Sequence, residues 1–221
     1  MFLFLSLRFN KQFVYNCTVI ESFANTETER LFATGKSRRL PPDILRRAVM
    51  RLTQLDAATV VEDMRQPPSN RLEVLSGNRA GQWSIRINDQ WRVCFRFERG
   101  NAFEVEIVDY HRGANTMKTK APVNGLPAIH PGEFLRETLG ELGLTQAAFA
   151  EAIDVSPMRV SHVLKGDRPV TAELALRLGR ALGQTPQYWL NLQVTFDLKV
   201  AQLEMKDSLN AVRALVLACP I

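Results

Sequence analysis

The spacing of apolar side chains changes along the chain, and its first part contains both regular patterns. Between residues 43 and 57 an apolar position recurs every three or four residues, which predicts a helix that begins near Asp43, after Pro41 and Pro42. The apolar stripe of this helix consists of Leu45, Ala48, Val49, Leu52 and Leu55. Its other face carries Arg46, Arg47 and Arg51.

After the breaker QPPSN the period falls to two. Four strands are predicted, in RLEVLSG, GQWSIRI, QWRVCFRFE and AFEVEIVDY, with turns at Asn88–Asp89 and at residues 99–101. Consecutive hairpins imply an antiparallel sheet, and one or two helices must cover its apolar face. We therefore expect an α+β unit that ends near His111.

The remaining patterns are helical. Residues 112–127 hold two glycines and two prolines with few large apolar side chains, so we expect a linker there. Five short helices follow, in PGEFLRETLGELGL, TQAAFAEAIDV, SPMRVSHVLKG, TAELALRLGRALG and TPQYWLNLQVTFDLKVAQLE. Thr145, Ser156, Thr171 and Thr185 each offer a capping oxygen. Residues 128–221 are thus predicted to form an all-α domain.

Composition narrows the class of protein. A chain of 221 residues with 46% hydrophobic and 23% charged residues can bury one large core or two small ones. No apolar run is long enough to span a membrane, and the opening MFLFLSL makes a poor signal peptide, so we expect a cytoplasmic protein without a membrane partner. Cys17, Cys94 and Cys219 are scattered, which indicates neither disulfides nor a zinc site, and we expect no metal or cofactor.

Charge distribution raises the prospect of a polyanionic partner. The formal net charge is +5, and the segment from Arg71 to Arg99 contains six arginines, three acids and no lysine. The planar guanidinium fork suits phosphate, whereas lysine is a point charge. A solvated strand face is the alternative explanation for the same residues.

The second half contains a motif in LTQAAFAEAIDVSPMRVSHVLKGDRPVT. Two short helices flank a tight turn at Asp154–Val155, and we expect them to touch through Ala148, Ala152, Val155, Val160 and Leu164. The motif resembles the helix-turn-helix of the Cro/repressor (XRE) family, whose second helix enters the major groove. This resemblance implies DNA contacts from Gln146, Ser156, Met158, Arg159, Ser161 and His162. A bundle that uses the same arrangement only for packing is the alternative.

The flanks of this motif narrow the resemblance. IHPGEFLRETLGELGLTQ and TPQYWLNLQVTFDLKVAQ resemble the HigA-type antitoxins, which repress their own operon and bind a toxin. The resemblance implies operator DNA as a partner, a homodimer on a palindromic site, and a toxin contact within or between chains. Trp189, Leu190 and Leu192 are expected to anchor the last helix in the core.

The first half is similar, from Val19 to His111, to the HigB branch of the RelE family. The similarity lies in the strands GQWSIRINDQWRVCFRF and in the ending DYH. It implies a RelE-like fold and a ribosome-dependent mRNA endonuclease whose other partner is mRNA on the ribosome. Two departures stand out: Ser76 takes the place of a lysine that these toxins often carry, and Asn88 stands where some relatives have arginine.

The cleavage chemistry can be assigned to particular residues. RNA carries its own 2′-hydroxyl nucleophile, so a metal-independent ribonuclease needs a base, an acid and cations for the developing phosphorane charge. We expect His111 to serve as acid or base and Arg92, supported by Arg86, to stabilise the phosphorane. Tyr110 is expected to stack on a base or position a proton, and Asp109 to orient His111. A polar sheet edge leading into a linker is the alternative for DYH.

The sequence therefore predicts two units with different functions. Residues 1–18 are expected to be an upstream extension, 19–111 the toxin domain, 112–127 the linker and 128–221 the antitoxin domain, with Met117 standing where an antitoxin would start. The leading hypothesis is a toxin–antitoxin fusion. A transcriptional regulator with a catalytically inactive toxin-like domain and a general RNA-binding protein are the alternatives. Whether neutralisation occurs within or between chains is left open, as are the codon preference and operator sequence.

Overall fold

The helix predicted at Asp43 is α2 (Pro42–Ala57) in the computed structural model, which describes residues 19–109, 119–120, 124–209 and 211–212. Four residues of its predicted apolar stripe are buried, and Leu45 is half-buried. A second helix, α1 (Thr26–Thr34), begins at Asn25, whose side chain accepts a hydrogen bond from Thr28 N. It ends at Gly35, which has a φ of +67°, a conformation that favours glycine.

The four predicted strands are present and joined as consecutive antiparallel hairpins. Two further strands of two residues each show no period in the sequence and were not predicted. The sheet order is β2-β3-β4-β5-β1-β6, and β1 runs parallel to β5. The strands are β1 (Ser22–Phe23), β2 (Glu73–Val74), β3 (Trp83–Arg86), β4 (Trp91–Glu98), β5 (Asn101–Asp109) and β6 (Thr119–Lys120).

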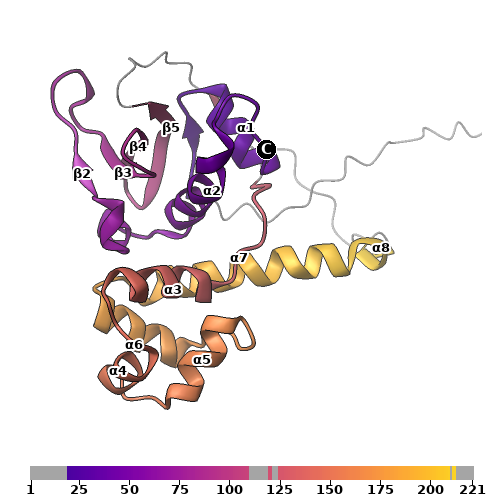
Figure 1. The fold of residues 1–221 in the computed structure, drawn as a ribbon. Helices are drawn as coiled ribbons and strands as arrows, with labels where there is room; N and C mark the ends of the chain where they lie inside the picture. The colour runs from indigo at the N-terminus through magenta and orange to yellow at the C-terminus, as the bar shows by residue number, and fades with distance from the viewer. Residues whose placement is uncertain (1–18, 110–118, 121–123, 210, 213–221) are drawn as a thin grey trace, which may run out of the picture.

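One face of the sheet packs against α1 and α2 (Figure 1). Leu31 and Phe32 of α1 share a buried cluster with Leu52 of α2 and with alternate strand residues such as Val93 and Val105. Three short 3-10 helices connect α2 to the strands: η1 (Val61–Arg65), η2 (Pro68–Asn70) and η3 (Gly77–Arg79). The predicted α+β unit is therefore confirmed.

The five helices predicted in the second half are present, and a short sixth one follows. Each of the four predicted caps accepts a hydrogen bond from a backbone N–H three residues further along. Trp189 and Leu192 are buried, and Leu190 is half-buried. The helices are α3 (Pro131–Glu141), α4 (Gln146–Ala152), α5 (Pro157–Lys165), α6 (Ala172–Leu182), α7 (Pro186–Glu204) and α8 (Lys206–Leu209).

The predicted contact between α4 and α5 is partly wrong. Val160 and Leu164 are buried as expected, but Ala148 and Ala152 are exposed. The buried stripe of α4 is instead formed by Phe149, Ala150 and Ile153. The larger Phe149 and Ile153 stand four residues apart on one face, so they fill the core and turn the small alanines outward.

The two units share parts of their cores. Leu126, from the expected linker, is buried in the cluster of the first unit, whereas Met50 and Ala57 of α2 are buried in the cluster of the second. Ile129 packs against both clusters. In Figure 1, α3 and α7 lie between the sheet unit and the helices α4 to α6. The domain boundaries drawn from the sequence stay a prediction.

None of the helices in the described residues is both long enough and apolar enough to cross a membrane.

Candidate functional site

Arg86 and Arg92 lie directly opposite each other on β3 and β4. Two like charges in this position repel, and neighbouring carboxylates offset the repulsion. Glu73 forms an ion pair with Arg92 at 3.0 Å, and Asp89 pairs with Arg86. Arg92 also donates from Nε to Ser84 Oγ at 2.9 Å and from Nη2 to Arg71 O at 2.9 Å. The two arginines predicted to stabilise phosphorane charge are therefore neighbours on one sheet face.

Asp109 lies on the other side of the sheet from these arginines. It is paired with Trp91, whereas Arg92 is paired with Val108, and successive strand residues point to opposite faces. Asp109 Oδ2 accepts a hydrogen bond of 2.8 Å from Gln90 Nε2. Tyr110 and His111 lie outside the described residues, so their predicted roles remain predictions.

The two departures from the toxin pattern have different surroundings. Asn88 has a local role, because its Oδ1 accepts hydrogen bonds from Gln90 N at 3.0 Å and from Trp91 N at 2.7 Å. An arginine could not accept these bonds, which hold the turn between β3 and β4. Ser76 is exposed and precedes η3 without a side-chain capping bond.

The residues predicted to face DNA lie along α5 and at the starts of α4 and α5. Met158 is 68% exposed, which places a large apolar side chain in solvent next to polar ones. A depression of about 440 Å³ is lined by several predicted residues, namely Ser156, Met158, Arg159 and His162, together with Arg168 and Thr171. Ser161 is half-buried beside them, and Gln146 is exposed at the first position of α4.

Arg159 is already engaged by its own domain. Its Nη2 donates to Glu173 Oε2 at 2.9 Å and to Thr171 Oγ1 at 3.2 Å, and its Nη1 donates to Glu173 Oε1 at 3.3 Å. Both partners belong to the start of α6. The side chain that was predicted to reach DNA therefore forms a two-pronged contact with a carboxylate.

Arg51 marks a contact that the sequence did not reveal. Its side chain is fully buried between the two units, although the helical pattern put it on the polar face of α2. Glu137 of α3 accepts from Nη1 at 2.9 Å and from Nη2 at 2.8 Å. Its remaining N–H groups reach Arg86 O, Gln54 Oε1 and Ser69 Oγ. All five guanidinium donors thus have an acceptor, as a buried charge requires.

A second buried carboxylate, Asp63 of η1, binds the start of α7. Its Oδ1 accepts from Thr185 N at 2.6 Å, and its Oδ2 accepts from Thr185 Oγ1 at 2.9 Å. Gln184 Nε2 donates to Asp63 O at 2.8 Å. A negative charge is favoured at a helix N-terminus, so Asp63 suits this position.

Further polar bonds extend the contact between the units. Asn191 of α7 donates to Ala57 O at 2.9 Å and so satisfies a carbonyl at the end of α2. Ser69 N donates to Glu141 Oε2 at 2.7 Å, which ties η2 to the end of α3. Tyr188 accepts a 3.3 Å bond from Gln54, and burial raises the pKa of its hydroxyl, so it stays protonated.

A buried cluster fixes the segment that joins the units. Asp56 accepts hydrogen bonds from Val19 N, Ile20 N and Asn124 Nδ2. Lys199 of α7 donates to Asn124 Oδ1 at 2.8 Å and to Leu126 O at 2.7 Å. Burial raises the pKa of Asp56 to about 6 and lowers the pKa of Lys199 to about 8.

The chain matches two family models. Residues 21–111 match the RelE-like toxin of the type II toxin–antitoxin system HigB, and residues 135–189 match a helix-turn-helix family. The endoribonuclease HigB of Proteus vulgaris is 32% identical over 93 residues, which are 42% of this chain and 100% of that protein. Virulence-associated protein I of Dichelobacter nodosus is 45% identical over 97 residues, 43% of this chain and 89% of that protein.

A solved structure matches as well. The Pseudomonas aeruginosa antitoxin HigA, solved with the higBA promoter, is 34% identical, covers 41% of this chain and 100% of its own, and has a TM-score of 0.40. Antitoxin HigA-1 of Vibrio cholerae is 42% identical over 71 residues, which are 32% of this chain and 67% of that protein. The chain belongs to the HigB-like toxins and the HigA-type helix-turn-helix antitoxins. It joins a HigB-like half to a HigA-like half, as the sequence predicted.

The family assignment shows that the contact between the units joins the HigB-like half to the HigA-like half. Arg51, Asp63 and Asp56 belong to the HigB-like half, and Glu137, Thr185 and Lys199 belong to the HigA-like half or its end helix. Sequence reasoning missed these residues because each acquires its partner only in the folded chain. The signal for Arg51 was the face of α2 that carries Arg46, Arg47 and Arg51.

Proposed function

We propose that this chain is a toxin–antitoxin pair that neutralises itself. The HigB-like half is an endonuclease for mRNA on the ribosome, and the HigA-like half holds it inactive and binds operator DNA as a dimer. The observation that carries the proposal is the buried contact between Arg51 and Glu137. Such a fully paired charge favours one fixed arrangement of the two halves within one chain.

The proposed reaction uses groups of the HigB-like half alone. His111 exchanges protons with the 2′-hydroxyl or the leaving 5′-oxygen, and Arg92 stabilises the charge on the phosphorane, with Arg86 beside it. No step requires a metal ion bound to the protein. Asp109, which lies on the other sheet face from Arg92, acts by orienting His111, which follows it two positions along the chain.

The proposed DNA surface lies at α5 of the HigA-like half. Ser156, Met158 and His162 border the depression along this helix, and Gln146 starts the preceding one. The helices α4 and α5 lie on the side of the helical unit away from the sheet (Figure 1). DNA binding and inhibition of the HigB-like half therefore use different surfaces. A palindromic operator and a homodimer follow from the short reach of one recognition helix.

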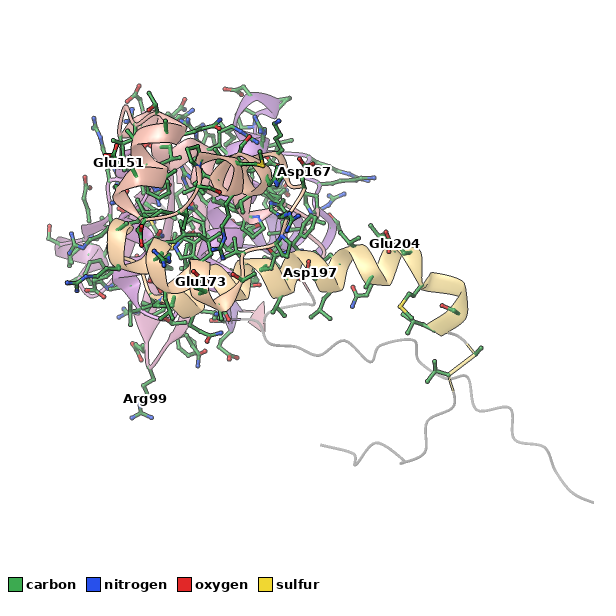
Figure 2. The ribbon with its side chains drawn as sticks, turned by 90° about the horizontal axis from the view of Figure 1, so that it is seen from below. Arg99, Glu151, Asp167, Glu173, Asp197 and Glu204 are labelled. Carbon is green, nitrogen blue, oxygen red and sulfur yellow. The ribbon has the colours of Figure 1, made fainter. Side chains whose placement is uncertain are left out.

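Toxicity of the HigB-like half tests the proposal. We expect residues 19–111 to arrest growth with mRNA cut on translating ribosomes, and the full chain to be far less toxic. His111→Ala and Arg92→Ala should lower the cleavage rate by about 10²-fold or more. Arg99→Ala is the matched control, because Arg99 lies at the tip of the turn between β4 and β5 and projects away from the body (Figure 2).

The same experiment separates the alternative function. A folded fragment of residues 19–111 that neither arrests growth nor cuts mRNA would identify a catalytically inactive domain. The chain would then act as a transcriptional regulator. Full toxicity of the His111→Ala fragment would contradict the role assigned to His111.

A further inference from the structure

The fork of Arg159 is the feature of the proposed DNA surface that the proposed function does not use. Reading a guanine requires two parallel N–H groups of an arginine, directed at O6 and N7 of the base. In this structure the Nη1 and Nη2 groups of Arg159 share one carboxylate, that of Glu173. The second N–H of Nη2 is directed at Thr171 Oγ1.

Two N–H groups of Arg159, on Nε and Nη1, have no acceptor within the described ranges. These two N–H groups point in different directions and are not parallel. A parallel pair needs an N–H of Nη2, and both N–H groups of Nη2 are already bonded to Glu173 and Thr171. Arg159 can thus give a single hydrogen bond to a phosphate while it stays on Glu173. It cannot also fork onto a base.

Glu173 is held from a second side as well. Arg177 Nε donates to Glu173 Oε1 at 3.2 Å, and its Nη1 donates to Ile153 O at 2.7 Å and Asp154 O at 2.9 Å. These two carbonyls belong to the turn between α4 and α5. A carboxylate shared by two arginines forms a network, which holds its geometry better than an isolated exposed ion pair does.

The contact favours the ionised form of Glu173. Hydrogen bonding and charge attraction from Arg159 hold the pKa of Glu173 below its usual range. A glutamate is ionised at neutral pH even without this shift, so the chain presents a fixed negative charge beside Arg159.

We propose that Glu173 is a positioning residue that withholds the fork of Arg159 from base edges. Operator selectivity then rests on Met158 and His162, and Arg159 supplies one backbone contact. This inference rests on the proposed DNA binding of the HigA-like half. It adds a residue of α6, outside the recognition helix, that limits binding to unrelated DNA.

Removal of the Glu173 carboxylate tests the inference in the full chain. We expect Glu173→Gln to raise the affinity for a scrambled duplex by about 3- to 10-fold and to steepen the salt dependence by about one unit, because the charge of Arg159 is no longer neutralised by Glu173 and acts fully on the phosphates. The affinity for the operator upstream of its own gene should change less, so the ratio of the two affinities falls. Circular dichroism and the thermal midpoint check the fold, and Glu173 is exposed.

Two matched variants show whether the effect passes through Arg159. Glu151→Gln removes the same charge from α4, whose Glu151 also lies on the outer part of the helical unit (Figure 2). Arg159→Ala removes the fork, and in that background Glu173→Gln should have no effect beyond that of Glu151→Gln.

Each other outcome contradicts a defined statement. If Glu173→Gln acts no more than Glu151→Gln, or acts equally after Arg159→Ala, the positioning role is overturned and repression stands. If it lowers operator affinity alone, Glu173 aligns Arg159 for base reading, which also overturns the inference. If the wild-type chain binds operator and scrambled duplexes equally, the proposed DNA binding itself fails.

Discussion

Single residues decide how firmly the two halves are joined, and Arg51 is the clearest case. Its guanidinium is fully buried and depends on Glu137 for two of its hydrogen bonds. A buried pair contributes little over an apolar replacement, but the loss of one partner leaves a charge without compensation. Loss of Arg51 or Glu137 alone should therefore destabilise the chain, whereas replacement of both by apolar side chains should cost little.

Glu137→Ala should destabilise the chain by about 3 to 5 kcal/mol, because Arg51 stays buried without its carboxylate. Denaturant unfolding of the full chain measures this loss. The matched control is Glu133→Ala, which breaks the ion pair with Arg46, whose side chain is 82% exposed. Exposed pairs contribute at most about 1 kcal/mol, so equal losses in the two variants would contradict the importance of burial.

Asp56 gives the stability of the chain a dependence on pH. Its pKa rises from 3.8 to about 6 on folding because of burial, so its stabilising contribution is complete below pH 3.8 and is lost as pH rises through 6. A pKa shift of about two units corresponds to a loss of about 3 kcal/mol in the free energy of unfolding. Burial lowers the pKa of His130, which acts in the opposite direction because stability is then lost as pH falls.

The difference between wild type and Asp56→Asn isolates this group. Between pH 4 and pH 6.5 the wild type should lose stability relative to the variant, as measured by urea unfolding at several pH values. The contribution of His130 cancels in the difference. A difference that stays constant over this range would show that Asp56 keeps an ordinary pKa in the folded chain.

At the scale of elements, helix ends serve the contact between the halves. Thr185 caps α7 through Tyr188 N and also donates to Asp63, whereas Thr145 caps α4 in solvent. The Thr185 side chain thus caps the N-terminus of α7 and also donates a hydrogen bond to a buried carboxylate of the HigB-like half. The cap of α7 forms part of the interface, unlike that of α4.

Thr185→Ala should therefore cost more than Thr145→Ala. Loss of a cap alone costs about 1 kcal/mol. Thr185→Ala also removes a hydrogen bond from a buried carboxylate, which adds about 1 to 3 kcal/mol. Thermal unfolding of both variants measures the difference, and equal shifts would mean that Asp63 does not depend on the Thr185 hydroxyl.

At the scale of the whole molecule, the two halves form one body with shared cores. Leu126 lies in the first core, and Met50 and Ala57 lie in the second. The interface is built of α2, η1 and η2 on one side and of α3 and α7 on the other. In the proposed function, the tether raises the effective concentration of the HigA-like half to about millimolar, so a linked antitoxin outcompetes a free one.

Cutting the chain should leave the halves together. With a protease site introduced among residues 112–116, we expect the cut halves to elute as one species at micromolar concentration in size-exclusion chromatography. Glu137→Ala should lower their affinity by more than about tenfold, because 1.4 kcal/mol is a factor of ten. Separation of the cut wild-type halves at micromolar concentration would refute neutralisation within the chain.

Local physics let the sequence determine most elements of this protein. A cap such as Ser156 and the period-two pattern of β4 act over a few residues, so they can be read without the fold. Arg86 and Arg92 lie opposite each other because of the register of β3 and β4, which no spacing in the sequence predicts. The resemblance, rather than the spacing, assigned the roles of these residues.

Only the tertiary structure decided which polar residues are buried and where they find partners. Arg51 meets Glu137 across 86 positions, Thr185 meets Asp63 across 122, and β1 pairs with β5 across some 80. The helical pattern assigns Arg51 to the polar face of its helix, but it does not reveal the carboxylate of Glu137 that the fold brings opposite it. In this chain the fold turns a polar helix face into the contact that joins the HigB-like and HigA-like halves.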